Sequence, residues 1–155
     1  MNYSRRFLVQ SLFGLLLLAM VAGCGGADQT DPKKTVISMF GAMERDDQAA
    51  LAHILDLAEL MRDTDQDYAL NTENPRVWTS PQDLLNDLTG DGLTKQRWFS
   101  YQRIINETKL SEGTATVEVT FVNKEESKGY RTLFGLHQVD GKWKIYSFKT
   151  LAEGS

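Results

Sequence analysis

Residues 114–123 read TATVEVTFVN, and this stretch decides the fold class. Small or apolar residues alternate with polar ones from Thr114 to Phe121. Successive side chains of a β-strand point to opposite faces of a sheet. One face would carry the apolar side chains of Ala115, Val117, Val119 and Phe121. The other face, with Glu118 and the threonines, would be wet, which is typical of an antiparallel sheet covered on one side only.

Three further strands are predicted around this one, over residues 97–110, 130–139 and 142–151. Asp140-Gly141 separates the last two, and this dipeptide is a strong signal for a two-residue hairpin. The four segments therefore predict an antiparallel meander.

The last hairpin can be paired by counting outward from its turn. Val139 would face Lys142, Gly135 would face Tyr146, and Phe134 would face Ser147. With this register neither face of the hairpin is uniformly polar. Two explanations remain open: a β-bulge near Tyr146 switches the faces, or a partner chain covers the second side.

Helices are predicted before the strands, over residues 33–45, 48–62 and 81–88. The first has apolar residues at helical spacing and could be capped by Asp31 or Thr30, with Pro32 at its first position. Ser80-Pro81 is a clear start for the third. Helices first and an antiparallel meander afterwards predict an α+β fold, with the helices packed on a curved four-stranded sheet.

This layout resembles the nuclear-transport-factor-2-like cone over residues 35–55 and 114–148. The features that carry the resemblance are two amphipathic helices joined by a short acidic hinge, a third helix, and long strands that end in Gly-Lys-Trp-Lys-Ile at 141–145. The resemblance implies a curved sheet that wraps a long helix, with a pocket in the mouth of the cone. It also implies that a homodimer could form through the outer face of the sheet.

The beginning of the chain has a different character. Arg5 and Arg6 precede the almost wholly apolar stretch 7–22, which is shorter than the ~20 residues of a spanning helix. A basic N-terminal region, an apolar middle and a cleavage site of small residues form a secretory signal. The cleavage site would lie in Val21-Ala22-Gly23-Cys24, which resembles the lipobox of bacterial lipoproteins. That resemblance implies cleavage after Gly23 and acyl chains on Cys24.

Several expectations follow from a lipidated Cys24. Residues 1–23 would be a signal peptide, 24–32 a flexible tether with a reach of ~15 Å, and 33–155 a single domain. Two or more acyl chains give a lasting membrane anchor outside the cytoplasm. Gly25 resembles the outer-membrane sorting pattern, so a host with two membranes would hold the domain on the periplasmic side of the outer one. Arg5-Arg6 leaves twin-arginine export open, although a general secretory signal fits the apolar stretch better.

The charge balance excludes one class of partner. Residues 1–23 contain two of the 17 basic residues and no acidic one, so the mature chain holds 15 basic and 21 acidic side chains, a net charge of −6. Nucleic-acid binders carry a basic surface instead.

Candidate site residues are few. A pocket in the cone mouth could be lined by aromatic residues that combine an apolar ring with a polar tip. The candidates are His53, Trp98, Tyr101, Phe134, Trp143 and Tyr146. No cofactor or metal is predicted: residues 63–67 begin like a calcium loop, but Tyr68 and Asn74 stand where glycine and glutamate are needed.

The sequence thus favours a non-enzymatic, lipid-anchored domain of the cell envelope that binds a small apolar ligand or an envelope protein. One alternative is a pocket enzyme of the same fold, an isomerase or dehydratase with His53 as general base. The other is an assembly module that works through the outer sheet face.

Overall fold

The computed structural model describes residues 28–62, 78–123, 125 and 128–151. Five helices precede or lead into four strands along the described chain. The helices are α1 (Pro32–Glu44), α2 (Gln48–Ile54), α3 (Leu57–Arg62), α4 (Pro81–Asp87) and α5 (Leu93–Ser100). The strands are β1 (Gln102–Ser111), β2 (Thr114–Val122), β3 (Gly129–Val139) and β4 (Lys142–Leu151). The predicted α+β class is confirmed.

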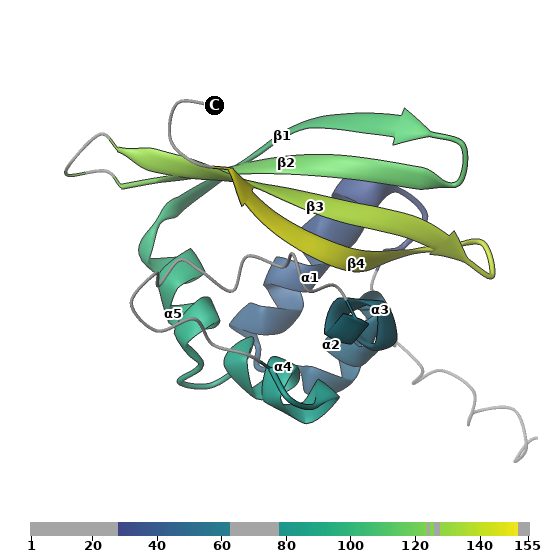
Figure 1. Cartoon of the computed structure of the whole chain (residues 1–155). Coiled ribbons are helices and arrows are strands. Elements are labelled where there is room, and N and C mark those ends of the chain that lie inside the picture. The colour runs from purple at the N-terminus through teal and green to yellow at the C-terminus, as the bar shows by residue number, and fades with distance from the viewer. Residues whose placement is uncertain (1–27, 63–77, 124, 126–127, 152–155) are drawn as a thin grey trace, which may run out of the picture.

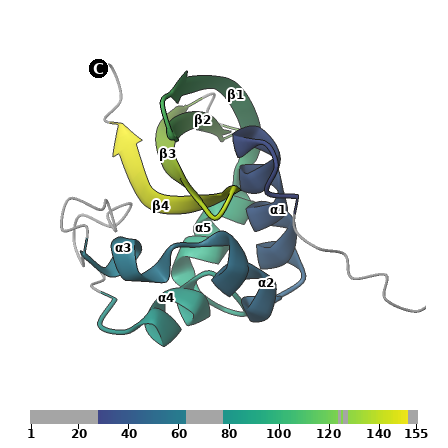
Figure 2. The same cartoon turned by 90° about the vertical axis from the view of Figure 1, so that its right-hand side faces the viewer.

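The four strands form one antiparallel sheet in the order β1-β2-β3-β4, which confirms the predicted meander. The helices lie together against one face of this sheet, and the strands curve toward them (Figures 1 and 2). This is the layout that the resemblance to the nuclear-transport-factor-2-like cone implied. The alternation in β2 holds, because Ala115, Val117, Val119 and Phe121 are all buried toward the helices.

The last hairpin resolves the two explanations left open. From Val139–Lys142 to Leu136–Ile145 the register is as counted, but Gly135 then pairs with Ser147 and Phe134 with Phe148. The pairings predicted for Gly135 and Phe134 are therefore wrong by one residue. A β-bulge at Tyr146 takes up that residue, and it turns Phe148 toward the core.

The helix predicted over 48–62 is broken in the middle. Leu55 is extended, with φ −89° and ψ 141°, and forms a parallel bridge with Ile145. The N–H of Asp56 donates to the carbonyl of Ile145 at 2.8 Å. The edge of β4 thus supplies the hydrogen bonds that a continuous helix would have made, and α3 begins afresh after Asp56.

The strand predicted from residue 97 begins only at Gln102. Residues 93–100 form α5 instead, and this helix turns Trp98 into the core. Neighbouring aromatic residues are common in strands. A helix can bury one large ring equally well.

The beginning of the domain also differs from prediction. Asp31 caps α1 by accepting from the N–H of Lys34 at 3.0 Å, and Pro32 is its first residue, as expected. Residues 28–31, which were predicted to belong to a flexible tether, lie on the folded domain through hydrogen bonds. The predicted signal peptide 1–23, with Val21, Ala22 and Gly23, lies outside the described residues, and so does Cys24.

Candidate functional site

The space between sheet and helices is filled by aromatic rings. Phe40 of α1 lies at the centre, with its ring centroid 5.8 Å from that of Trp98 and 5.9 Å from that of Phe134. Trp98 also stacks on Phe121 at 5.8 Å, and Trp143 is buried further along β4. Trp98, Phe134 and Trp143, which were predicted to line a pocket, are buried in this core.

The other predicted pocket residues are placed apart from one another. His53 is exposed on α2, so its imidazole does not reach the interior that a general base would need. Tyr146 lies on the outer face of the sheet, where its ring centroid is 5.0 Å from that of His137. Of the six candidates, Tyr101 alone lines a hollow that the structure describes.

That hollow, called here the end pocket, has a volume of about 620 Å³ and lies where α5 gives way to β1. Tyr101 is the hinge between them, with extended backbone at φ −107° and ψ 154°. Gln102 then pairs with Val122 at the end of β2, which brings the following loop alongside. The described lining residues are Phe99, Ser100, Tyr101, Gln102, Arg103, Asn123 and Glu125.

Arg103 supplies the positive charge of the end pocket and is held rigidly. Its guanidinium carbon lies 3.9 Å from the centroid of the Phe99 ring and 5.3 Å from that of Phe40. Nη1 donates to the carbonyl of Trp98 at 3.1 Å. Burial lowers the pKa of Arg103, and the carboxylate of Glu44 opposes that shift. An arginine remains charged in such a setting, so the pocket presents a fixed cation.

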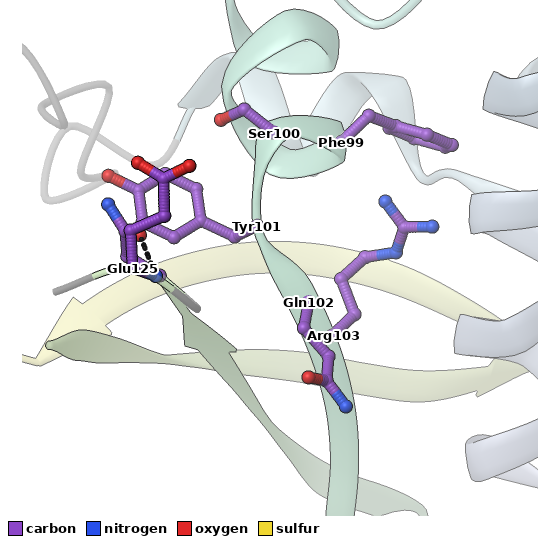
Figure 3. Close-up of a pocket in the computed structure, with 7 residues that line it drawn as sticks. Phe99, Ser100, Tyr101, Gln102, Arg103 and Glu125 are labelled. Carbon is purple, nitrogen blue, oxygen red and sulfur yellow. Dashed lines mark hydrogen bonds between the residues drawn. The ribbon is translucent and has the colours of Figure 1, made fainter. Parts of the chain in front are cut away.

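The opposite side of the end pocket is formed by Tyr101 and Glu125 (Figure 3). The ring of Tyr101 packs edge-on against Tyr130 at 5.3 Å. Asn123 Oδ1 accepts from the N–H of Glu125 at 2.9 Å, which fixes the beginning of the β2–β3 loop. A ligand would therefore meet aromatic rings, a cation on one side and a carboxylate on the other.

The described lining of the end pocket contains one hydroxyl nucleophile candidate, Ser100. The same lining contains no histidine or cysteine, and the hydroxyl of Ser100 donates to the carbonyl of Arg97 at 2.7 Å. A serine nucleophile needs an adjacent base to take its proton.

A second hollow of about 780 Å³ lies beside the outer face of β1 and β2. Two of its polar lining residues, Asn106 and Glu118, bond to each other and to neighbours on the outer face. The amide of Asn106 donates to Glu118 Oε1 at 3.0 Å and to Thr120 Oγ1 at 2.6 Å. Arg131 donates to the other carboxylate oxygen of Glu118 at 3.4 Å.

The sequence missed the pairing of His137 with Asp56. His137 Nε2 and Asp56 Oδ2 lie 2.9 Å apart, although 81 positions separate the two residues. An imidazole held by a carboxylate is a common catalytic arrangement. Neither residue lines the two hollows described here, however. Asp56 reaches the sheet because the helix is broken between α2 and α3, and no local sequence pattern predicts that break.

Two searches of the described residues gave negative results. No group of three or more His, Cys, Asp or Glu side chains there is arranged to hold a metal ion. No described helix combines the length and apolar character needed to cross a bilayer. The calcium-like segment 63–67 lies outside the described residues.

Comparison with known proteins gave one similar structure. No protein-family model and no curated protein sequence matches the chain. A crystal structure from Xanthomonas campestris, provisionally described as a calcium/calmodulin dependent protein kinase II association domain, is similar with a TM-score of 0.44. The two chains share 16% sequence identity, over 77% of this chain and 84% of that chain.

Proposed function

We propose that this protein is a lipid-anchored, non-enzymatic domain of a bacterial cell envelope that binds a small ligand or a partner protein in the end pocket. The placement is supported by the sequence alone: a basic N-terminal region, an apolar stretch and the lipobox at Val21–Cys24 stand in the right order. Acyl chains on Cys24 would hold the domain at a membrane.

The end pocket supports the proposal that the domain binds a ligand. Small-molecule sites are concave, contain aromatic walls and have a few polar groups in fixed positions. Tyr101 and Phe99 supply the rings, and Arg103 is fixed by its contacts with Phe99 and the Trp98 carbonyl. A pre-positioned cation spares a ligand the entropic cost of ordering it.

The two alternative functions have less support. An enzyme with His53 as base requires that side chain inside a pocket, but it is exposed. An assembly module with an apolar outer sheet face is opposed by the polar network of Asn106, Glu118 and Arg131 on that face. A homodimer through the outer sheet face stays a prediction.

The test uses protein extracted from its own membranes in mild detergent. Intact mass should show residues 1–23 removed and acyl chains on Cys24. Native mass spectrometry should show a bound molecule or protein. Gln102→Trp would fill the end pocket and should remove what is bound. Ile104→Trp is the matched control, because this exposed residue lies on the same strand and face but lines neither hollow.

Two results would refute the proposal separately. An unmodified Cys24 would remove the membrane placement. A bound molecule that survives Gln102→Trp as well as Ile104→Trp would remove the end pocket as its site.

A further inference from the structure

Gln29 fastens the chain to the sheet before the first helix begins. Its side chain is buried, and Nε2 donates to the carbonyls of His53 at 3.1 Å and Trp143 at 3.0 Å. In return the N–H of Trp143 donates to the carbonyl of Gln29 at 3.0 Å. A buried amide with several satisfied hydrogen bonds specifies one arrangement, because any other leaves polar groups unpaired.

Asp28 continues this attachment onto α1. Its N–H donates to Ser38 Oγ at 3.2 Å, and its carboxylate lies 3.2 Å from Lys34 Nζ. The same carboxylate accepts from the N–H and the hydroxyl of Thr30, which lowers the pKa of Asp28. Asp28 is therefore attached to the folded domain, and three residues of the sequence, Gly25, Gly26 and Ala27, separate it from Cys24.

The covalent length of this connection is short. Four residue steps from Cys24 to Asp28 span at most ~14 Å when fully extended. Acyl chains on Cys24 would hold Asp28 within that distance of the lipid headgroups, whatever path the three residues take.

Gln29 contacts one end of the sheet, and the end pocket lies at the other. Trp143 is next to the β3–β4 turn, and Gln138 donates to the carbonyl of Gly113, so the β1–β2 turn lies beside it. We call this the hairpin end. Along β2, Thr114 lies at the hairpin end and Val122 beside the end pocket, which is about 26 Å at ~3.3 Å per residue. Figure 1 shows both turns at one end of the sheet and the junction of α5 with β1 at the other.

We infer that the domain stands with its hairpin end toward the membrane and its end pocket facing away, open to molecules of the aqueous compartment. This orientation rests on the proposed lipidation of Cys24. The sheet is longer than the tether, so the two ends cannot exchange places.

The surface of the hairpin end carries lysines and one exposed leucine. Lys33, Lys142 and Lys144 make no ion pair with any described residue. Leu110, near the β1–β2 turn, is 68% exposed. Unpaired lysines are attracted to anionic headgroups, whereas the mature chain as a whole is acidic and is repelled by them. Glu112 and Asp140 lie in the same two turns, so the orientation rests on tether length and not on charge.

The test measures depth from two positions on the full-length acylated protein. The chain has one cysteine, and acylation blocks its sulfur, so an introduced cysteine is the only free thiol. Lys142→Cys probes the hairpin end and Gln102→Cys the end pocket, and both positions are exposed. Each carries a fluorophore, in vesicles of phosphatidylethanolamine and phosphatidylglycerol with a nitroxide on some headgroups. We expect several-fold stronger quenching at 142 than at 102.

Two further variants test the cause of this difference. A flexible Gly/Ser insertion between Gly26 and Ala27 changes no described residue and should abolish the difference. Gln29→Ala should reduce it, whereas Gln82→Ala, at an exposed glutamine of α4, should leave it unchanged.

The outcomes separate the two proposals. Equal or reversed quenching on a protein with acylated Cys24 overturns the orientation alone. A difference that persists after the Gly/Ser insertion also overturns it, because tether length would not then be its cause. An unmodified Cys24 in a soluble product overturns both the orientation and the proposed anchor.

Discussion

The two faces of the sheet are built from the same strands but are held in different ways. The face toward the helices buries Val117, Phe121 and Phe134 completely. The outer face carries Glu118 and Arg131, which are linked to each other and remain partly exposed. Apolar burial drives folding, whereas hydrogen bonds at a wet surface largely replace bonds to water. We therefore expect side chains on the face toward the helices to contribute most of the free energy of unfolding.

The largest expected effect comes from adjacent residues on opposite faces. Phe134→Ala should lower the free energy of unfolding by about 3–5 kcal/mol, because a ring that packs against Trp98 and Phe148 leaves a cavity. Leu133→Ala, on the outer face, should cost less than about 1 kcal/mol. Denaturant unfolding of both variants measures this. Equal losses would show that the outer face is covered.

Gly135 tests the bulge that aligns the two faces of β4. A Cβ here would lie 2.4 Å from Ser147 Oγ and 3.1 Å from Tyr146 Cζ, on the outer face. Gly135→Ala should therefore cost about 1–3 kcal/mol by overpacking. Adding Tyr146→Ala should restore part of the loss, since the two changes share one contact. Strict additivity in this double-mutant cycle would argue against the clash.

The hydrogen bond between His137 and Asp56 connects the junction of α2 and α3 to the outer face of the sheet. Asp56 also accepts from the N–H of Glu59 and so begins α3. Asp56→Ala removes both bonds and should cost about 1–2 kcal/mol, a typical loss for a helix cap with a further hydrogen bond. His137→Ala removes one and should cost less. Thermal unfolding distinguishes them, and the reverse order would contradict the dual role of Asp56.

The smallest expected effect is a pH dependence confined to the inner face. Burial raises the pKa of Tyr130, which stacks on Phe121, well above its usual value near 10.0. The folded state then keeps a proton that the unfolded state loses, so stability is full below pH 10 and falls as the pH rises above it. Tyr130→Phe should lessen this alkaline loss. An identical alkaline profile for Tyr130→Phe and the unaltered protein would refute the assignment.

Local patterns predicted much of the fold because they record which side chains face the core. The alternation in 114–123 gave β2 and its buried face, and Asp140-Gly141 gave the turn between β3 and β4. The cap and proline at Asp31-Pro32 gave the beginning of α1. These features depend only on interactions between residues that are close in the sequence.

The candidate site was predicted less well, because its residues meet only after folding. Trp98 and Phe134 were expected in a pocket, but an aromatic residue has the same sequence signature in a core as in a binding site. Arg103 and Glu125 were not singled out, since nothing near them in sequence shows that α5 ends against the end of β2.

The sequence by itself determined the order of the elements, the buried face of β2 and the expectation of an acylated Cys24. Each of these depends on side-chain periodicity or on a short contiguous motif. Tertiary structure alone decided the break at Leu55, the bulge at Tyr146, the attachment of Gln29 to Trp143 and the filling of the interior. In those places, contacts between distant residues outweigh local preference, because a buried backbone group or ring is stabilised by whatever partner the whole fold brings to it.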